Sequence, residues 1–240
     1  MKNVALFTWT NTEYEDVFPV YFGGIEKYFP QVEKSYVAIN ALSEVIGDQH
    51  LQLVNEEQNS YAERILGCLD AVEEEYIIYA QEDFMLYDKV PTREFNKALN
   101  FLKKNEEFSC VKLLRSGADT LEEKLTTNIY KSCDYYSAVH QVSIWRKDHL
   151  VEILNTLNPV HLRNFEYAGN ASRVMHQLGY QSAFYFSESS PHRGGHFDSK
   201  AYPYIATALI KGKWNTAEYQ KEIDQLAEEY SIDINQRGTL

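Results

Sequence analysis

The sequence predicts one α/β domain, with a mainly parallel central sheet that helices flank. Apolar runs rich in aromatic and β-branched residues, typical of buried strands, occur at 4–7, 35–39 and 76–80. Between the second and third runs, residues 62–72 have apolar side chains at helical spacing, with Ser60 as a plausible N-cap. This β–α–β order favours parallel strands joined by a right-handed crossover.

The 240 residues contain no linker, repeat or low-complexity segment, so we expect a single domain over 1–240. Residues 1–90 form a regular half, and residues 91–240 form an α+β half that covers it. The elements expected in the second half are a helix opened by Pro91-Thr92, a strand at 111–114, a polar loop at 117–127, an extended stretch at 135–145, a helix ended by Pro159, a helix at 165–178 stopped by Gly179, a strand at 182–186, a loop at 187–200 and a helix at 219–230.

Composition narrows the class of protein. The net charge of −12 argues against nonspecific binding to nucleic acid or anionic lipid, because both require a basic surface. The three cysteines are widely spaced, which suits a reducing compartment without disulfides. The N-terminus turns polar too early for a signal peptide, and no apolar run reaches the roughly 20 residues of a membrane span. We therefore expect a cytoplasmic protein.

The strand at 76–80 runs into Gln81, Glu82 and Asp83 before the chain turns apolar again. Adjacent carboxylates beside a buried strand are unusual, because an unpaired charge is costly to remove from water. Open α/β sheets bind ligands beyond the carboxyl ends of their strands. Carboxylates are the ligands that Mg²⁺ and Mn²⁺ prefer, with phosphate and water completing the shell. The two acids therefore form either a metal site or a polar turn in water.

Glu166 lies near the start of a predicted helix. It is either a first-turn acid that stabilises the helix dipole or a general base for a hydroxyl nucleophile. Arg173 follows on the same helical face, where it either holds this carboxylate or a phosphate, or makes a surface ion pair.

The loop at 189–196 combines His192, Arg193 and His196 with two glycines. Glycines let the backbone approach a ligand closely, histidines complete a metal shell or bind phosphate, and arginine neutralises a diphosphate. A mobile polar surface loop explains the same composition. The other histidines show no HxxxH or HExxH spacing, so a zinc site has little support.

Several familiar signatures are missing. The sequence has no GxGxxG after the first strand, no GxxxxGK[ST] and no GxSxG. Dinucleotide-binding, Walker-type and α/β-hydrolase functions are therefore not supported.

Three stretches resemble bacterial nucleotide-sugar glycosyltransferases with the GT-A fold. YIIYAQEDFMLY resembles their signature strand, which ends in a DxD-type motif often reduced to DD or ED; here Gln81 replaces the first aspartate. VHQVSIWRKDHLVEIL followed by NFEYAGNAS is similar to the Q-x-x-[IL]-W-[RK]-x-x-x-L … E-x-x-G stretch of capsule- and surface-polysaccharide members. RGGHFDSKAYPYIATALIKGKWN is similar to their C-terminal end. The resemblance covers residues 4–214 and implies a GT-A-like, Rossmann-like fold.

The resemblance implies an inverting glycosyltransferase of surface polysaccharide or glycan synthesis. It would move a sugar from a nucleotide-diphospho-sugar donor to a hydroxyl of a saccharide or lipid-linked saccharide acceptor, assisted by Mn²⁺ or Mg²⁺. Residues 1–90 would bind the nucleotide, and residues 91–240 the acceptor. The implied roles are donor binding by Thr8, Trp9, Thr10, Glu82, Asp83 and Arg193, metal binding by Glu82, Asp83, His192 and His196, acceptor binding by Arg115, Gln141 and Trp145, and catalysis by Glu166 as the base.

Two other functions stay open. A nucleotidyltransferase on a similar sheet usually has a Gly-rich, basic loop after the first strand, but Thr8–Asp16 contains neither glycine nor a basic residue. A non-catalytic carbohydrate- or protein-binding domain would use the many tyrosines, and its acids would be incidental. The sequence does not predict the oligomeric state.

Overall fold

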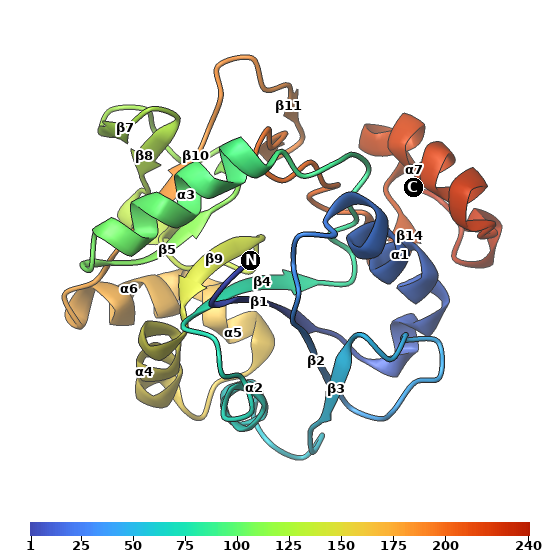
Figure 1. Cartoon of the computed structure of the whole chain (residues 1–240), viewed down its shortest axis with the longest axis horizontal. Coiled ribbons are helices and arrows are strands. Elements are labelled where there is room, and N and C mark those ends of the chain that lie inside the picture. Colours follow the sequence, from blue (N-terminus) through green and yellow to red (C-terminus); the bar gives the residue numbers. More distant parts are fainter.

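The computed structural model describes residues 1–240, except the side chain of Ala168. A mixed sheet forms the centre of the chain, and helices cover both of its faces (Figure 1). This confirms the predicted α/β fold class. The strands of this sheet are β1 (Val4–Trp9), β2 (Ser35–Ile39), β3 (Leu51–Val54), β4 (Tyr76–Gln81), β5 (Phe108–Lys112), β7 (Lys124–Thr126), β8 (Ile129–Lys131), β9 (Ser143–Arg146) and β10 (Gln181–Tyr185).

The strand order is β3-β2-β1-β4-β9-β5-β10-β8-β7. The first four strands in this order are parallel, with Trp9 opposite both Ala38 of β2 and Gln81 of β4. Strand β9 enters antiparallel between β4 and β5. The carboxyl ends of β1, β2 and β4 therefore meet at one edge of the sheet, where α/β proteins place their ligands.

The helices divide into two layers because alternate side chains of a strand point to opposite faces. On β1, Val4 and Leu6 join one apolar cluster with α1, α3 and α7, whereas Ala5 and Phe7 join a second cluster with α2, α4, α5 and α6. These helices are α1 (Phe18–Tyr28), α2 (Tyr61–Leu69), α3 (Thr92–Lys104), α4 (Lys147–Leu157), α5 (Leu162–Glu166), α6 (Asn170–Gln177) and α7 (Thr216–Tyr230).

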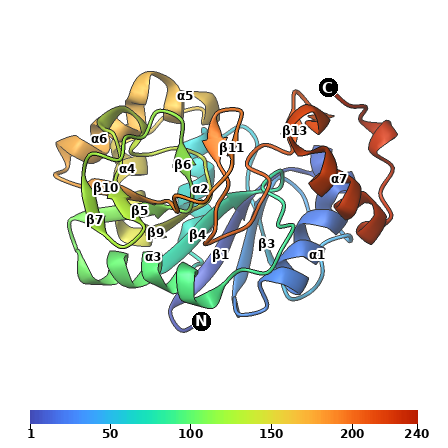
Figure 2. The ribbon, with the colours of Figure 1, turned by 90° about the horizontal axis from the view of Figure 1, so that it is seen from above.

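Short strands and the C-terminal segment gather at the edge where the carboxyl ends of β1, β2 and β4 meet (Figure 2). Figure 2 shows α5, β11 and β13 at the edge opposite the N-terminus. The short strands are β6 (Arg115–Ser116), β11 (His192–Arg193), β12 (His196–Phe197), β13 (Leu209–Ile210) and β14 (Lys213–Trp214). Strand β12 pairs with both β6 and β11, and β13 pairs with β14.

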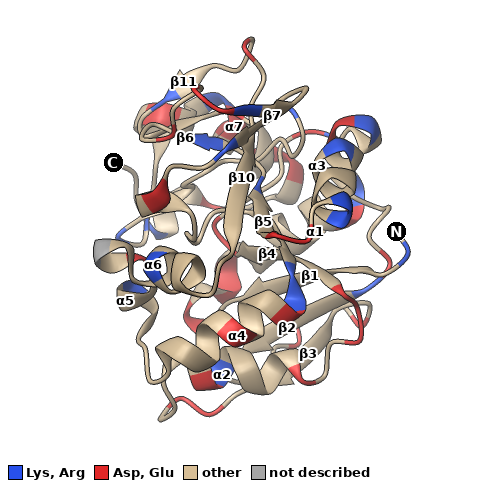
Figure 3. Cartoon of the chain, turned by 90° about the vertical axis from the view of Figure 1, so that its left-hand side faces the viewer, with Lys and Arg blue, Asp and Glu red and all other residues tan. Residues whose placement is uncertain are grey.

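Charged residues are mixed over the side of the molecule that Figure 3 shows, where several basic residues lie on α3 and acidic residues on α4. Among the described residues, no helix is both long enough and apolar enough to cross a bilayer. The cytoplasmic location stays a prediction.

Several predicted elements differ from the structure. The predicted loops at 117–127 and 187–200 contain β7, β11 and β12, and the strand predicted at 111–114 lies at Phe108–Lys112 as β5. The predicted helix over 165–178 is divided into α5 and α6, because Gly169 adopts a left-handed φ of 67° between them. A Cβ at this position would lie 3.3 Å from the carbonyl oxygen of Tyr135. The predicted extended stretch over 135–145 contains only β9 at its end, since a short 3₁₀ turn, Asp134–Tyr136, occupies its start.

Candidate functional site

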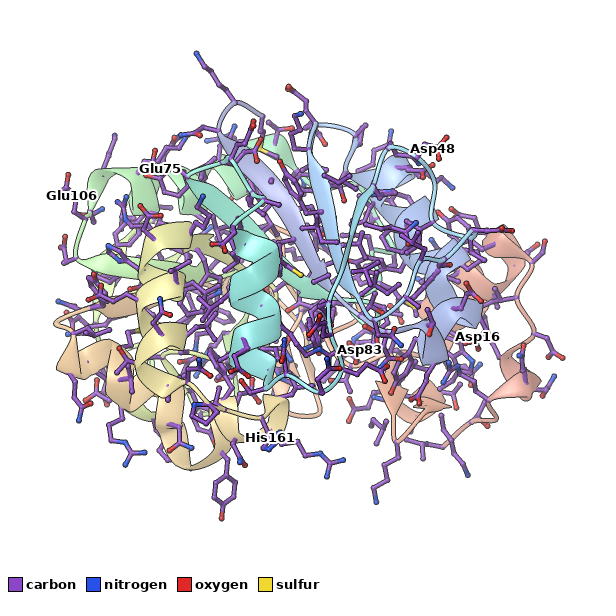
Figure 4. The ribbon with its side chains drawn as sticks, turned by 90° about the horizontal axis from the view of Figure 1, so that it is seen from below. Asp16, Asp48, Glu75, Asp83, Glu106 and His161 are labelled. Carbon is purple, nitrogen blue, oxygen red and sulfur yellow. The ribbon has the colours of Figure 1, made fainter. Side chains whose placement is uncertain are left out.

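A cavity of about 400 Å³ lies beyond the carboxyl ends of β1 and β4, and Glu82 and Asp83 are among the residues that line it. In Figure 4, Asp83 lies toward the same end of the molecule as Asp16 and His161, and Glu75, which precedes β4, lies at the opposite end. The cavity is lined by Trp9, Thr10, Asn11, Tyr14, Gln81, Glu82, Asp83, Leu162, Arg163, Leu209, Lys211 and Gly212.

Of the paired acids, Glu82 is buried and Asp83 is half-buried with an enclosed Oδ1 atom. Glu82 is only 8% exposed, and burial raises the pKa of its carboxyl well above the ordinary range. Burial also raises the pKa of Asp83, and the neighbouring Glu82 raises it further. The enclosed Oδ1 atom of Asp83 makes no hydrogen bond within the described residues. Such a pair is costly when both acids are ionised, and a cation would relieve that cost.

The loop after β1 forms the first wall of the cavity and is held in a fixed shape. Thr10 donates its backbone N–H to Ala38 of β2. The side chain of Asn11 accepts a hydrogen bond from the N–H of Glu13 at 2.8 Å and caps the following 3₁₀ turn. Asn40, which follows β2, accepts the N–H of Thr12 at 2.9 Å. The loop therefore presents Trp9, Thr10 and Tyr14 to the cavity on a rigid frame.

The C-terminal segment forms the second wall. The N–H of Ala208 donates to the backbone carbonyl of Asp83 at 3.2 Å, which ties the start of the β13–β14 hairpin to the acidic pair. Lys211 and Gly212 form the loop of this hairpin and line the cavity. Arg237 forms an ion pair with Asp16 and lies near enough to Glu82 to oppose part of the effect of burial on its pKa.

The start of α5 forms the third wall through Leu162 and Arg163. A second cavity of about 530 Å³ adjoins the first, because Trp9, Asn11 and Leu162 line both. Its remaining walls come from the loop before α2 and the first turn of α2, including Tyr61 and Arg64, and from Pro159 and His161 between α4 and α5.

A network of polar aromatic side chains supports the floor of the site. Gln81, which lines the first cavity, donates to the hydroxyl of Tyr79 at 3.3 Å. The Tyr79 hydroxyl lies 3.0 Å from that of Tyr61 and 3.4 Å from Nδ1 of His140. Burial lowers the pKa of His140. Glu166 is exposed, and its carboxylate accepts the backbone N–H of His140.

The structure brings four of the predicted ligand-binding residues together: Trp9, Thr10, Glu82 and Asp83 line one cavity. It places Thr8 and Trp145 in the interior and Gln141 at a half-buried position. The hydroxyl of Thr8 is paired with that of Tyr21 at 2.9 Å, and Trp145 is buried in the cluster beneath α4. The side-chain oxygen of Gln141 accepts a hydrogen bond of 2.8 Å from the hydroxyl of Tyr204.

The predicted basic residues already have partners in the chain. Arg193 contacts Glu222 through two hydrogen bonds of 2.8 Å and forms an ion pair with Asp198 at 3.1 Å. Arg115 lies over the rings of Phe186 and Phe197. These contacts account for both side chains without a ligand.

The predicted metal-binding histidines lie on the β11–β12 hairpin, where His192 packs on the ring of Phe197 and burial lowers the pKa of His196. Neither is among the described residues that line the cavity. Across the described part of the chain, no three residues of the types His, Cys, Asp and Glu are grouped to hold a metal ion. The predicted set of four ligands, Glu82, Asp83, His192 and His196, is therefore not assembled.

Sequence patterns did not indicate Tyr14, Arg163, Lys211 or Arg237. All four reach the site from segments outside the signature strand, and the last two come from more than 120 residues further along the chain. The only local signal is Gly212, a turn residue between Leu209-Ile210 and Lys213-Trp214.

No family model matches the chain, and no curated protein matches it. Solved structures do match. A cytidylyltransferase from Leptospira borgpetersenii serovar Hardjo-bovis is 11% identical, with 98% of each chain covered and a TM-score of 0.53. A CMP:2-keto-3-deoxy-manno-octonic acid synthetase complexed with CTP is 12% identical, with 76% of this chain and 88% of that one covered and a TM-score of 0.49.

The bifunctional IspDF from Campylobacter jejuni is also similar, at 12% identity and a TM-score of 0.46, with 77% of this chain covered. The chain spans half the length of that protein. At these identities the similarities show the fold alone. The match to the cytidylyltransferase extends over 98% of both chains and so covers the whole domain.

This match corrects the family resemblance drawn from the sequence motifs, and with it the predicted glycosyltransferase function. A solved structure that matches over 98% of both chains is a cytidylyltransferase. The physical reason for the error is that a buried strand ending in two acids suits any parallel sheet that binds a metal-chelated phosphate. The motif therefore indicates the place of the site and does not distinguish the group transferred.

Proposed function

We propose that the chain is a nucleotidyltransferase. It would bind a nucleoside triphosphate at the carboxyl ends of β1 and β4 and transfer the nucleotidyl group to an acceptor. The observation that carries the proposal is the carboxylate pair, Glu82 and Asp83, in a cavity that also presents Arg163 and Lys211. The fold shared with a cytidylyltransferase over the whole chain supports it.

The residues present fit a divalent cation such as Mg²⁺ or Mn²⁺. The unpartnered Oδ1 of Asp83 is a free oxygen ligand, and Glu82 adds a second carboxylate. Mg²⁺ in nucleotide enzymes is commonly held by one or two carboxylates, with phosphate oxygens and water as the other ligands. When bound, the cation would offset the charge of the polyphosphate and of the pyrophosphate that leaves.

The missing Gly-rich, basic loop after β1 no longer excludes this function. Positive charge reaches the cavity from other elements, through Arg163 of α5 and Lys211 of the β13–β14 hairpin. We place the nucleoside in the adjoining cavity, where Trp9 offers an aromatic surface and the guanidinium of Arg64 lies 4.6 Å from the Trp9 ring.

The reaction would be an in-line displacement at the α-phosphorus. An oxygen of the acceptor forms a bond to this phosphorus while the bond from the phosphorus to the bridging oxygen of pyrophosphate breaks. The electron pair of the broken bond leaves with pyrophosphate, and any proton of the acceptor oxygen passes to water. The chain's contribution is to hold the triphosphate in place on a rigid frame and to exclude water from the acidic pair.

A two-stage experiment tests this function. CTP, UTP, ATP and GTP are each added with Mg²⁺ in a thermal-shift assay, and we expect at least one to raise the melting temperature. That triphosphate is then incubated with acceptors that carry a carboxylate, a phosphate monoester or a hydroxyl, and pyrophosphate release is measured alongside the mass of the product. Release of nucleoside diphosphate with a glycosylated acceptor, from nucleotide-sugars only, would contradict the proposal.

A further inference from the structure

The hairpin loop Lys211-Gly212 has a backbone conformation that suits lysine poorly. Strands β13 and β14 pair Ile210 with Lys213, which leaves a two-residue loop with φ of 51° at Lys211 and 78° at Gly212. Two-residue loops with positive φ at both positions favour Asn-Gly, Asp-Gly or Gly-Gly. A lysine Cβ is strained in the left-handed region, so the choice of lysine needs another explanation.

No contact within the described residues explains it. Lys211 is exposed and makes no ion pair or side-chain hydrogen bond with any residue that the structure describes. Arg237, which lies beside the same loop, is engaged with Asp16. Lys211 is therefore a cation whose position is strained and whose charge is not used by the fold.

The loop shares a cavity with the acidic pair. Lys211 and Gly212 line the same cavity as Glu82 and Asp83. Two backbone hydrogen bonds hold the hairpin, because the N–H of Ala208 donates to the carbonyl of Asp83 and the backbone N–H of the buried Trp214 donates to the carbonyl of Gly238. The backbone that carries the free Lys211 ammonium is thus tied to the cavity of the two carboxylates, one of which has an unpartnered oxygen enclosed by protein.

We propose that the Lys211-Gly212 loop is the polyphosphate-binding element of the cavity, with the Lys211 ammonium bound to the phosphates that leave as pyrophosphate. This inference rests on the proposed nucleotidyl transfer and assigns the triphosphate end of the substrate to the C-terminal hairpin. The acids with their cation and the ammonium would then bind the polyphosphate from two sides. A lysine in place of the usual asparagine or glycine gives up some folding stability for this charge.

The experiment compares three substitutions in the loop with one beside it. Lys211→Asn and Lys211→Gly remove the charge and suit the positive φ, whereas Lys211→Arg keeps the charge. Lys213→Asn is the matched control, because Lys213 is an exposed lysine two residues further along the same hairpin and is absent from the described cavity lining. Binding of inorganic pyrophosphate, and of the nucleoside triphosphate that binds most tightly, is measured by calorimetry in Mg²⁺.

We expect Lys211→Asn and Lys211→Gly to weaken pyrophosphate and triphosphate binding about tenfold, since a charge-assisted hydrogen bond to phosphate is lost. Lys211→Arg should bind within a few-fold of the wild type, and Lys213→Asn should match it. The melting temperatures of Lys211→Asn and Lys211→Gly should equal or exceed that of the wild type, because the strain is relieved. Melting temperatures at or above that of the wild type would show that these variants lose binding without losing the folded state.

Unchanged binding in Lys211→Asn and Lys211→Gly would overturn the inference and leave the proposed function standing. An equal loss in Lys213→Asn would also overturn it, since the effect would then be general electrostatics. If the wild-type protein binds neither pyrophosphate nor any triphosphate in Mg²⁺, the proposed function and this inference both fail.

Discussion

Two pairs of ionisable side chains lie at the same edge of the sheet. In one pair the opposite charges satisfy each other, and in the other two like charges lie side by side. Lys112 ends β5 and is fully buried, with its ammonium 2.8 and 2.9 Å from the two carboxylate oxygens of Asp119 and 2.9 Å from the carbonyl of Tyr136. Glu82 and Asp83 follow β4, carry like charges, and leave an enclosed oxygen without a partner.

The difference separates a structural use of buried charge from a functional one. Asp119 also accepts hydrogen bonds from the N–H and the hydroxyl of Ser116. The Lys112–Asp119 pair therefore holds the loop between these residues and has no free hydrogen-bonding atoms left for a ligand. The second pair faces a cavity and is incomplete without a cation. Burial alone therefore does not identify a site at this edge; the unsatisfied oxygen does.

The largest effect should come from breaking the satisfied pair. Asp119→Ala leaves the Lys112 ammonium buried without its partner, and we expect the free energy of unfolding to fall by about 3–5 kcal/mol. Urea denaturation measures the change. A loss below about 1 kcal/mol would show that this pair is not the anchor of its loop.

Glu82 and Asp83, the unsatisfied pair, should make the free energy of unfolding fall as the pH rises, whereas acids with a lowered pKa make it rise. The buried Glu82 carboxyl has a pKa raised to about 7, so near neutral pH the folded state holds a proton that the unfolded state has released. The free energy of unfolding should therefore fall as the pH rises from about 4.5 to 7, by on the order of 3 kcal/mol for a single carboxyl.

Urea titrations at several pH values, with Glu82→Gln as the matched variant, measure this slope. The variant should remove much of the decline, and Mg²⁺ should restore stability to the wild type above pH 7. Parallel profiles for the two proteins would contradict the assignment.

The next prediction concerns the cation. Asp83→Asn keeps the volume of the side chain but removes one of the two carboxylates, so Mg²⁺-dependent triphosphate binding should weaken about a hundredfold. Stability near pH 8 should rise, because a buried like charge is removed. Calorimetry and urea denaturation check the two expectations, and a variant that binds as tightly as the wild type would move the metal site elsewhere.

The smallest effect is expected at Arg193, which is half-buried between Glu222 and Asp198. Arg193→Gln should cost about 1–2 kcal/mol of unfolding free energy, since charge-assisted hydrogen bonds are lost at a partly exposed position. Triphosphate affinity should stay within a few-fold of the wild type. A tenfold loss of affinity without destabilisation would place Arg193 at the substrate after all.

Within residues 1–90, local patterns predicted β1, β2, α2 and β4 but not α1 or β3. Strand β2 has its predicted bounds, and Ser60 caps α2 in a capping box with Glu63. Helix α1 was not predicted, because it is buried on nearly all sides and its aromatic residues show no helical period. Its burial comes from the sheet on one side and from the C-terminal helix, whose Tyr28–Glu229 hydrogen bond joins residues far apart in sequence.

The candidate site also combines residues that local sequence could predict with residues that only tertiary structure brings together. Glu82 and Asp83 could be predicted because the strand that positions them is adjacent in sequence. The roles predicted for Arg115 and Arg193 depended on these cations being free, and only tertiary structure shows their aromatic and acidic partners. Lys211 could not be predicted from its spacing, since a hairpin more than 120 residues from Asp83 brings it to the cavity.

The most direct test of the unsatisfied pair is titration calorimetry of the wild-type protein with CTP, UTP, ATP and GTP, each in Mg²⁺ and again in EDTA. We predict that at least one triphosphate binds in Mg²⁺ and that its binding is lost in EDTA. Equal affinity in EDTA, or no binding of any triphosphate in Mg²⁺, would contradict the claim that Glu82 and Asp83 await a cation that carries a polyphosphate.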